Sequence, residues 1–254
     1  MSFKKPVCVI TGVLGGIGSS LAEVLQTQHG YFIIGIDVLP MKQSEKFIDK
    51  FIQCNIASLA LNSEEGEAVA TNLVDVISKA GPLKVLINNA AKQIVKPIED
   101  TSIADWNEVM ATNVGAPFAL IKLALPFLKK CKGSIINIAS IHANLTKPEF
   151  VAYASSKGAL VALTRALAVE LGHVGIRVNA ILPAATSTPM LLAGFEGKPV
   201  AFKALERMHP LGRICAPSEI AEVVAFLASN KAEFVSGAAW QIDGGIGGRL
   251  HDPV

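Results

Sequence analysis

The sequence predicts one α/β domain in which about seven parallel strands form a doubly wound sheet with helices on both faces. Short apolar runs rich in β-branched residues recur along the chain, and longer segments with helical periodicity separate most of them. A glycine-rich turn at residues 11–18 joins the first apolar run to the first helical segment. This combination is typical of the Rossmann-type fold, which binds dinucleotides.

The individual elements follow from local patterns. Strands are expected at six apolar runs and one weaker run, which are Val7–Ile10, Phe32–Ile36, Phe51–Gln53 (the weaker one), Lys84–Ile87, Ser134–Ile138, Arg177–Ile181 and Ala239–Ile242. Helices are expected at Ile17–Gln28, Asn62–Lys79, Asp105–Lys130, Ala152–Leu171 and Ser218–Ala228. Pro117 and Pro126 are expected to mark bends in the third helix. Alternation at this spacing predicts right-handed crossovers and a sheet buried on both sides.

Residues 1–254 are expected to form one domain, because the chain shows no internal repeat, low-complexity stretch or linker. The longest irregular segment is Pro183–Pro217. Irregular segments of this length are often functional. Since this one contains several apolar residues, we expect a lid over a substrate site at about residues 184–216. The alternative is a surface excursion with short helices of its own.

The composition excludes several classes of function. The 254 residues are 51% hydrophobic and carry a formal net charge of +2, which gives no field to gather nucleic acid or an anionic membrane. No unbroken apolar run approaches the roughly 18–20 residues of a membrane span. The four cysteines form no C-x-x-C pair. We therefore expect a cytoplasmic protein with reduced thiols, no metal site, and no nucleic acid or membrane as partner.

The glycine-rich turn is the expected phosphate site. Gly12, Gly16 and Gly18 allow a tight turn and a close approach of a pyrophosphate to the main chain. The helix that begins there offers free N–H groups and the positive end of its dipole. We expect these glycines and Ile17 to contact the cofactor. A plain tight turn is the alternative.

An acidic residue selects the form of the cofactor. Asp37 ends the second expected strand, 19 residues after Gly18, where this fold places an acid against the adenosine ribose. A carboxylate there can accept hydrogen bonds from both ribose hydroxyls and would repel a 2′-phosphate. The turn itself contains no Arg or Lys, and the nearest base, Lys42, is expected in solvent. The sequence therefore predicts NAD rather than NADP.

A tyrosine and a lysine suggest acid–base chemistry. Tyr153 and Lys157 are four residues apart on an expected helix and so share one face. A neighbouring ammonium favours the phenolate, so Lys157 is expected to lower the pKa of Tyr153 and make it a usable base for an alcohol proton. Ser140 follows the expected strand Ser134–Ile138 at the edge where ligands of such sheets bind. Its hydroxyl is expected to hold the substrate oxygen.

By its motifs, the chain resembles the short-chain dehydrogenase/reductase family over almost its whole length. The pattern T-G-x-x-x-G-x-G starts at Thr11, Y-x-x-x-K spans residues 153–157, and D-G-G spans residues 243–245. The family's N-N-A-G is found as N-N-A-A at residues 88–91. The resemblance implies that Asn113 completes the catalytic set and anchors a water that relays protons to Lys157. It also implies that Tyr153 and Lys157 contact the cofactor.

The resemblance implies three further cofactor contacts. Asn89 is expected on the adenosine side. Asn55 stands where many relatives carry an Asp that meets the adenine. Residues 183–188, P-A-A-T-S-T, are similar to the family's P-G-x-x-x-T with Ala184 in place of Gly, and imply that Thr188 bonds the nicotinamide carboxamide.

Three residues are expected to face the substrate: Gln93, His142 and Phe150. Gln93 and His142 stand where the 3-hydroxybutyrate dehydrogenases of this family carry a Gln and a His that hold a carboxylate. Those relatives also carry a Lys at the position of Phe150, so the carboxylate anchor is incomplete here. His142 as a generic polar wall is the alternative. Hydroxy acids, sugars, polyols and cyclic ketones remain open as substrates.

The predicted function is an NAD-dependent oxidoreductase that interconverts a secondary alcohol and its ketone by hydride transfer. One alternative is an NADPH-dependent 3-oxoacyl-type reductase, which Asp37 disfavours. Another is a non-catalytic NAD-binding regulatory protein, which would not need Ser140, Tyr153 and Lys157. The resemblance also implies a homotetramer or homodimer formed through the long helices.

Overall fold

The seven predicted strands form one parallel sheet, which confirms the predicted fold class. The computed structural model describes residues 4–43, 45–61 and 63–250. The strand order across the sheet is β3-β2-β1-β4-β5-β6-β7. The strands are β1 (Val7–Thr11), β2 (Phe32–Asp37), β3 (Lys50–Gln53), β4 (Leu83–Asn88), β5 (Ser134–Ile138), β6 (Arg177–Pro183) and β7 (Ala239–Ile242).

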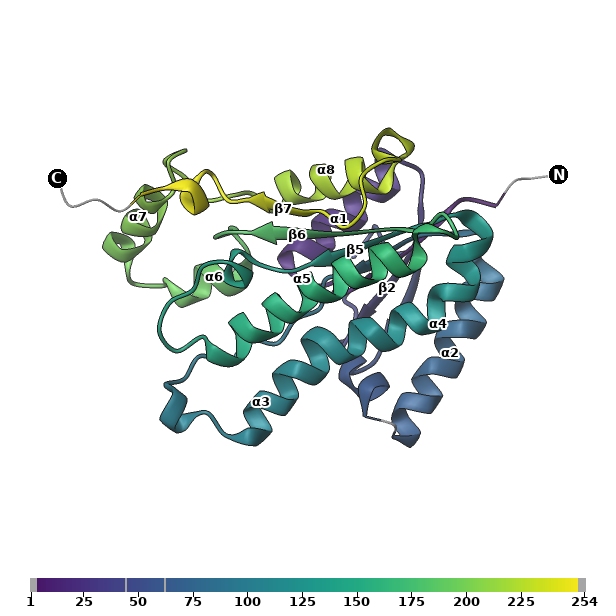
Figure 1. Cartoon of the computed structure of the whole chain (residues 1–254), viewed down its shortest axis with the longest axis horizontal. Helices are drawn as coiled ribbons and strands as arrows, with labels where there is room; N and C mark the ends of the chain where they lie inside the picture. The colour runs from purple at the N-terminus through teal and green to yellow at the C-terminus, as the bar shows by residue number, and fades with distance from the viewer. Residues whose placement is uncertain (1–3, 44, 62, 251–254) are drawn as a thin grey trace.

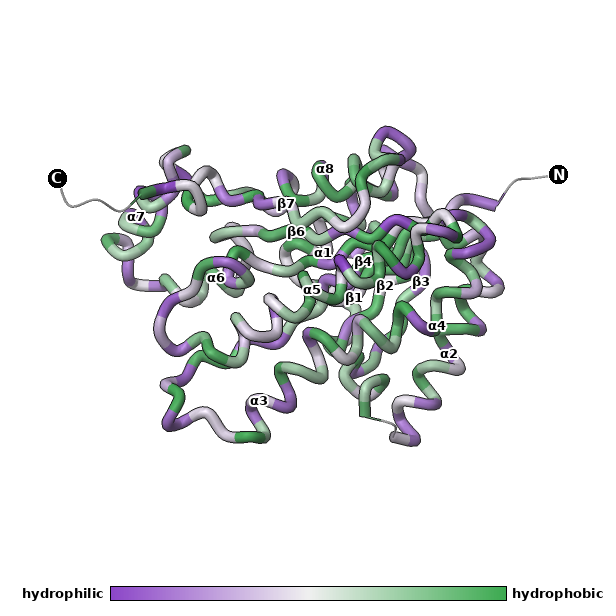
Figure 2. The backbone as a smooth tube through the Cα atoms, viewed as in Figure 1, coloured by the Kyte–Doolittle hydropathy of each residue, from purple (hydrophilic) through white to green (hydrophobic). Residues whose placement is uncertain are grey.

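Side chains of the strands alternate between two cores, as the two-residue period of a strand requires. In β1, Cys8 and Ile10 belong to one core and Val7 and Val9 to the other. Helices α1 and α8 cover the first core, and α2, α4 and α5 cover the second (Figure 1). Figure 2 shows apolar residues concentrated along the central strands. These helices are α1 (Gly16–Thr27), α2 (Glu64–Ala80), α4 (Ala116–Cys131), α5 (Val151–Gly172) and α8 (Pro217–Ala228).

The expected helix Asp105–Lys130 begins earlier and contains an irregular turn. It consists of α3 (Ile103–Met110), a π-helical turn η3 (Ala111–Gly115) and α4. Pro117 lies in the first turn of α4, where its missing N–H costs little. The irregular turn therefore lies before this proline and not at it. The helix expected from Asn62 begins at Glu64, and Asn62 lies outside the described residues.

This long helical stretch is also apolar. Ile103–Cys131 is the one helical stretch of the described residues that is long and apolar enough to cross a membrane. The core helices of water-soluble proteins can be equally long and apolar. Here α4 packs on β4 and contributes to the second core.

Part of the segment Pro183–Pro217 is helical. It contains α6 (Pro189–Gly194) and α7 (Pro199–Met208), so the expectation of a wholly irregular segment was wrong. Thr188 caps α6, and each helix has a proline in its first turn. The remaining short helices are η1 (Ile56–Ala60), η2 (Ile98–Asp100), η4 (Ile141–Ala143), η5 (Asn230–Ala232) and η6 (Ile246–Gly248).

The strand order reverses between β1 and β4, which both pair with their neighbours in parallel. In open α/β sheets, a ligand crevice lies outside the carboxyl ends of the strands at this reversal. The carboxyl end of β1 leads into the glycine-rich turn, and that of β4 leads into Asn89 and Ala90. The topology therefore places the expected cofactor site at this edge.

Candidate active site

The glycine-rich turn has the shape of a phosphate cradle. Gly12 has φ +63°, and a Cβ there would lie 2.8 Å from Cα of Ala90. A Cβ on Gly18 would overlap the carbonyl oxygen of Gly12. Gly15 precedes α1 without any side-chain cap, so the first N–H groups of this helix are free for an anion. These features fit the pyrophosphate of a nicotinamide dinucleotide.

Asn89 holds this turn against the end of β4. Its Nδ2 donates to the carbonyl oxygens of Thr11 (3.0 Å) and Gly12 (2.9 Å), while its main-chain N–H donates to Thr11 Oγ1 (2.9 Å). Both amide hydrogens are therefore engaged by the main chain of the turn. In this structure Asn89 shapes the cradle, and a direct contact with adenosine would have to use its Oδ1.

Asp37 lies at the carboxyl end of β2 and is 9% exposed. One carboxylate oxygen accepts the N–H of Leu14 (3.0 Å) and the other accepts that of Leu39 (3.1 Å). Each oxygen retains a lone pair, because a carboxylate can accept about four hydrogen bonds. Asn55, by contrast, uses its Oδ1 to cap η1 through the N–H of Ala57 (3.1 Å).

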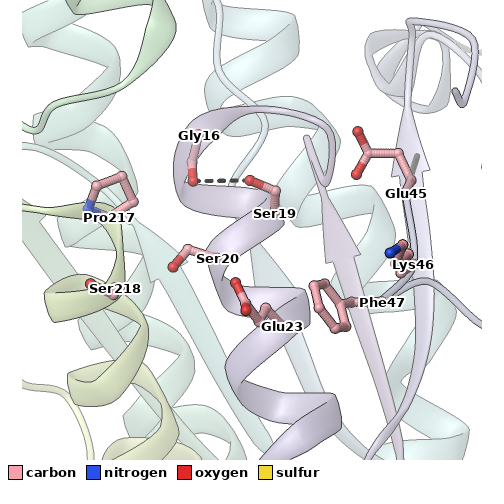
Figure 3. A pocket seen from close by; sticks show the side chains of 9 residues that line it. All are labelled: Gly16, Ser19, Ser20, Glu23, Glu45, Lys46, Phe47, Pro217 and Ser218. Atoms are coloured by element: carbon pink, nitrogen blue, oxygen red, sulfur yellow. Dashed lines mark hydrogen bonds between the residues drawn. The ribbon is translucent and has the colours of Figure 1, made fainter.

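A hollow of about 380 Å³ opens beside the turn, between α1, the segment after β2 and the start of α8 (Figure 3). Two carboxylates and one ammonium line it, from Glu23, Glu45 and Lys46. No motif in the sequence marks these residues, because their proximity depends on how the segment after β2 folds back toward α1. Lys42, as expected, is exposed.

Ser140, Tyr153 and Lys157 come together at the carboxyl end of β5. Tyr153 and Lys157 lie on α5, and the Lys157 Nζ is 5.5 Å from the Tyr153 ring centroid. Ser140 follows β5, and its side chain lies near enough to the Tyr153 hydroxyl to influence its pKa. Lys157 is 1% exposed, and its ammonium donates to the carbonyl oxygen of Ile138 (2.8 Å). The structure thus brings together the three side chains that the sequence predicted.

Burial sets the protonation of this pair. It lowers the pKa of Lys157 to about 7 and raises the pKa of Tyr153 above its usual value, against a smaller lowering by the nearby Ser140 side chain. The expectation that Lys157 lowers the pKa of Tyr153 was therefore wrong for this structure. A lysine that titrates near neutrality provides only a partial positive charge to its neighbour.

Asn113 lies in the π-helical turn and joins three segments. Its Oδ1 accepts the N–H of Lys92 (2.7 Å), and its Nδ2 donates to the carbonyl oxygen of Lys92 and to Ser156 Oγ (2.9 Å each). Ser156 in turn donates to the carbonyl oxygen of Tyr153 (2.7 Å). Ser156 was missed in the sequence, where only its position next to Lys157 could have pointed to it.

An aromatic wall stands beside Tyr153. The rings of His142 and Phe150 stack with centroids 4.5 Å apart and an interplanar angle of 5°. Both rings make T-shaped contacts with the Tyr153 ring, with centroid distances of 5.6 Å for His142 and 6.2 Å for Phe150. Two of the three expected substrate residues therefore adjoin Tyr153, the residue expected to be catalytic, whereas Gln93 lies in the exposed segment after β4.

Thr188 adjoins the glycine-rich turn. A Cβ on Gly16 would lie 2.9 Å from the Thr188 Cβ, so glycine is what allows this approach. The preceding segment is held by Cys215, whose carbonyl oxygen accepts the N–H of Ser187 (2.8 Å) and whose N–H donates to Ala185 (3.0 Å). The segment expected to hold the nicotinamide therefore lies next to the segment expected to hold the phosphates.

Comparisons with known proteins agree with this arrangement. A family model described as enoyl-(acyl carrier protein) reductase matches residues 12–247. A solved structure of a short chain dehydrogenase family protein from Francisella tularensis is 29% identical, with a TM-score of 0.81 over 96% of this chain and 100% of the other. The chain belongs to the short-chain dehydrogenase/reductase family.

Two curated relatives in this family are alcohol dehydrogenases. Meso-2,3-butanediol dehydrogenase of Serratia marcescens is 33% identical, over 96% of this chain and 96% of its own. Cyclohexanol dehydrogenase of an Acinetobacter species is 32% identical, over 95% of each chain. These relatives support a short-chain dehydrogenase/reductase that oxidises or reduces at a secondary alcohol carbon.

Solved structures support a nicotinamide dinucleotide as cofactor. Aldohexose dehydrogenase of Thermoplasma acidophilum, in ligand-free form, is 27% identical with a TM-score of 0.89 over 99% and 97% of the chains. 4-Hydroxyisoleucine dehydrogenase was solved with NADH and the protein ElxO with NADP, each 26% identical with a TM-score of 0.85 over 97% and 100%. Members of the short-chain dehydrogenase/reductase family similar to this chain thus bind either form.

Proposed function

We propose that this chain is an NAD-dependent enzyme that interconverts a small secondary alcohol and its ketone by hydride transfer. The observation that carries the proposal is the meeting of Ser140, Tyr153 and Lys157 beside a phosphate cradle at one sheet edge. A nucleotide-binding protein without turnover would need the cradle and Asp37 but none of these three side chains.

Each of the three side chains has a role that its position supports. The side chains of Ser140 and Tyr153 lie near one another, so both hydroxyls could hydrogen-bond one substrate oxygen. Ser140 holds that oxygen as charge develops on it. Tyr153 accepts the alcohol proton during oxidation and returns it during reduction. When bound, the nicotinamide dinucleotide accepts or supplies the hydride.

Lys157 supports Tyr153 and contacts the nicotinamide ribose in this proposal. Its buried ammonium already has one fixed acceptor, Ile138 O, which sets its direction. Asn113 completes the catalytic set. Because its two amide hydrogens are engaged by Lys92 and Ser156, a relay water would bind its main-chain carbonyl or the second lone pair of Oδ1.

The proposed preference for NAD rests on Asp37. Its carboxylate is fixed by two main-chain N–H groups and keeps lone pairs for ribose hydroxyls. A 2′-phosphate near this carboxylate would meet like charge, and the nearby hollow adds Glu23 and Glu45 against only Lys46. The proposed cofactor contacts are Gly12, Gly16, Ile17, Gly18, Asp37, Asn55, Asn89, Tyr153, Lys157 and Thr188.

The same observations weigh against the NADPH-dependent 3-oxoacyl-type reductase, since that enzyme would need a cation where Asp37 stands. We further propose a cytoplasmic homotetramer or homodimer with a small-molecule substrate. The cysteines in the described part of the chain form no disulfide, as expected in a reducing compartment. On the long helices, Phe118 of α4 and Val169 of α5 are 53% and 86% exposed.

A substrate panel tests the proposal. The purified protein is incubated with NAD or NADP and with a vicinal diol, a cyclic alcohol, an aldose and a hydroxy acid, and formation of the reduced nucleotide is followed by absorbance. We expect turnover of at least one secondary alcohol, and faster turnover with NAD than with NADP. Turnover with NADP alone would overturn the cofactor assignment, and no turnover with either nucleotide would favour the non-catalytic alternative.

A further inference from the structure

The first turn of α5 carries Tyr153 but has no side-chain cap. Tyr153 is the third residue of this helix, and the N-cap residue Phe150 forms no side-chain hydrogen bond to it. Uncapped helix ends fray. The proposed role of Tyr153 requires its hydroxyl to stay within hydrogen-bond reach of the substrate oxygen, and a misplacement of about 1 Å can cost about 10²-fold in rate. Contacts from other segments must therefore fix the start of α5.

One such contact comes from the segment that follows β4. The main-chain N–H of Lys96 donates to the carbonyl oxygen of Glu149 (3.1 Å), the residue just before the N-cap of α5. Glu149 has φ +72°, a left-handed conformation that a residue with a Cβ adopts only where its surroundings hold it. The next residue is Phe150, whose ring makes a T-shaped contact with that of Tyr153. The hydrogen bond from Lys96 therefore acts on the backbone that leads to Tyr153.

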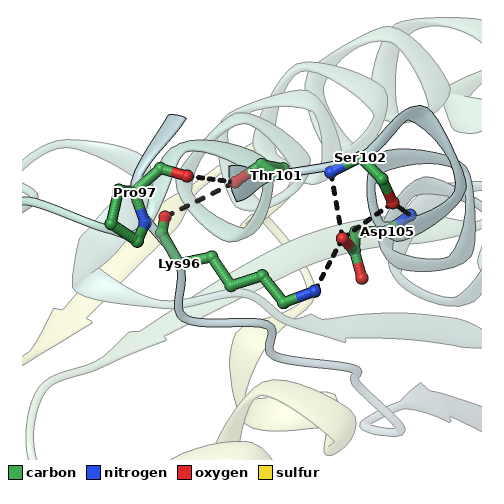
Figure 4. A network of polar contacts seen from close by, with 5 residues as sticks. All are labelled: Lys96, Pro97, Thr101, Ser102 and Asp105. Carbon is green, nitrogen blue, oxygen red and sulfur yellow. Dashed lines mark hydrogen bonds and ion pairs between the residues drawn. The ribbon is translucent and has the colours of Figure 1, made fainter. Parts of the chain in front are cut away.

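The side chain of Lys96 is anchored at the start of α3. Its Nζ donates to Asp105 Oδ2 (2.8 Å), and the same oxygen accepts the N–H (3.0 Å) and the hydroxyl (2.8 Å) of Ser102 (Figure 4). Ser102 Oγ accepts the N–H of Asp105 in return (3.0 Å), which completes the capping box of α3. The hydrogen bond from Lys96, followed by those from Ser102, lowers the pKa of Asp105 to about 2. At neutral pH Lys96 therefore has a charged partner in a fixed position.

The main chain of Lys96 is held as well. The Thr101 hydroxyl donates to the carbonyl oxygen of Pro97 (2.9 Å) and also contacts that of Lys96 (3.4 Å), as Figure 4 shows. Thr101 lies just before the capping residue of α3, and α3 itself packs against α5. The position of Lys96 is therefore set by α3, and Lys96 in turn joins α3 to the backbone before α5.

We propose that Lys96 is a positioning residue for Tyr153. Its ion pair with Asp105 fixes residue 96, the N–H of that residue fixes the Glu149 carbonyl, and the first turn of α5 follows. The expected effect on turnover rests on the proposed function. Lys96 itself contacts neither the glycine-rich turn nor Asp37, so binding of the cofactor should not depend on it.

Substitution of Lys96 tests this role. Lys96→Met removes the ion pair and keeps an unbranched side chain. We expect the single-turnover rate of nucleotide reduction with the best alcohol to fall about tenfold, as for a displacement of Tyr153 by less than about 1 Å, while the Kd for NADH changes little. Lys96→Arg should restore most of the rate, because a guanidinium also pairs with a carboxylate. An unchanged rate in Lys96→Met would overturn the proposal.

Two further variants locate the effect in this pair. Lys79→Met is the matched control, because it breaks an exposed pair of similar length, with Asp75 of α2 (2.7 Å), and should leave the rate unchanged. Exposed pairs contribute little to stability, so neither methionine variant should unfold. Asp105→Asn keeps an acceptor for the cap of α3 and should lower the rate as Lys96→Met does, and the double variant should be no slower than either one. Multiplied effects would show that the two residues do not act as a pair.

A spectroscopic measurement separates this inference from the proposed function. The chain has two tyrosines, so a Tyr31→Phe protein grown with 3-fluorotyrosine gives one ¹⁹F signal, that of Tyr153. Because the rings of His142 and Phe150 adjoin Tyr153, the signal depends on its position. We expect Lys96→Met to shift or broaden the signal and Lys79→Met to leave it unchanged. If the signal responds but no alcohol is turned over, the proposed function fails and the positioning role stands. If alcohols are turned over and Lys96→Met changes neither signal nor rate, only the positioning role fails.

Discussion

The burial of the Lys157 ammonium makes the stability of the protein depend on pH. Its pKa is about 7 in the fold against 10.5 for the free side chain, so between these values the unfolded chain binds a proton that the folded chain has released. The free energy of unfolding therefore rises with pH across this window. Below about pH 7 both states are protonated, and the full cost of burying the charge is present.

Lys157→Met removes this titration. We expect the variant to gain stability relative to the parent, most at about pH 6 and less at about pH 9, because the parent recovers up to about 1.4 kcal/mol per pH unit in between. In the variant, the Ile138 carbonyl oxygen loses the hydrogen bond from Lys157, which lowers the free energy of unfolding by an amount that does not depend on pH. Denaturant unfolding at the two pH values measures the difference. The same difference at both would show that Lys157 is not held with a lowered pKa.

For single residues, the spacing along the sequence predicted contacts within one helix but not contacts between distant segments. Tyr153 and Lys157 meet because residues four apart share a face. The bond between Asn113 and Ser156 joins residues 43 apart and depends on how α5 packs on the π-helical turn. The direction of the Tyr153 pKa was also missed, because it depends on burial rather than on spacing.

Among the elements, the junction of β1 and α1 depends most on one residue type. A Cβ at Gly18 would overlap the Gly12 carbonyl oxygen, which forms part of the turn itself. Gly18→Ala should therefore destabilise the protein by about 1–3 kcal/mol and weaken NADH binding at least about tenfold. Thermal unfolding and a fluorescence titration with NADH measure the two effects.

Gly172→Ala is the matched control for this substitution. Gly172 ends α5 with a φ that other residues adopt, and a Cβ added there would meet no atom within 4 Å. Alanine there should be neutral or stabilise by up to about 1 kcal/mol, because it restricts the unfolded chain. If both substitutions had the same effect on NADH binding, the fit of the turn to the pyrophosphate would not explain it.

The sequence predicted the long elements better than the short ones. All seven strands and the five long helices were predicted: the helices have several turns and five of the strands are buried apolar runs, whereas β3 and β7 are marked only by short runs that are partly exposed. The helices α6 and α7 are six and ten residues long, too short for periodicity to stand out. The sequence signals for their starts were two prolines: Pro189, which follows the capping residue Thr188, for α6, and Pro199 for α7. No pattern predicted the π-helical turn.

For the whole molecule, the topology follows from the alternation of strands and helices, but the assembly does not. The exposed Phe118 and Val169 are large apolar side chains on the two long helices. We expect a dimer or tetramer in solution, which light scattering or sedimentation would measure. Phe118→Asp with Val169→Asp should shift the mass toward that of one chain. A monomeric parent protein would contradict this prediction.

The proposed mechanism requires that Tyr153 exchange a proton with the substrate while the rest of the site binds the cofactor. A comparison of Tyr153→Phe with the parent protein, for turnover of the best alcohol and for affinity toward NADH, separates these two tasks. We expect turnover to fall by about 10²–10⁴-fold, the usual contribution of a general acid–base residue, while the NADH dissociation constant changes little. Turnover that survives in Tyr153→Phe would show that another group exchanges the proton.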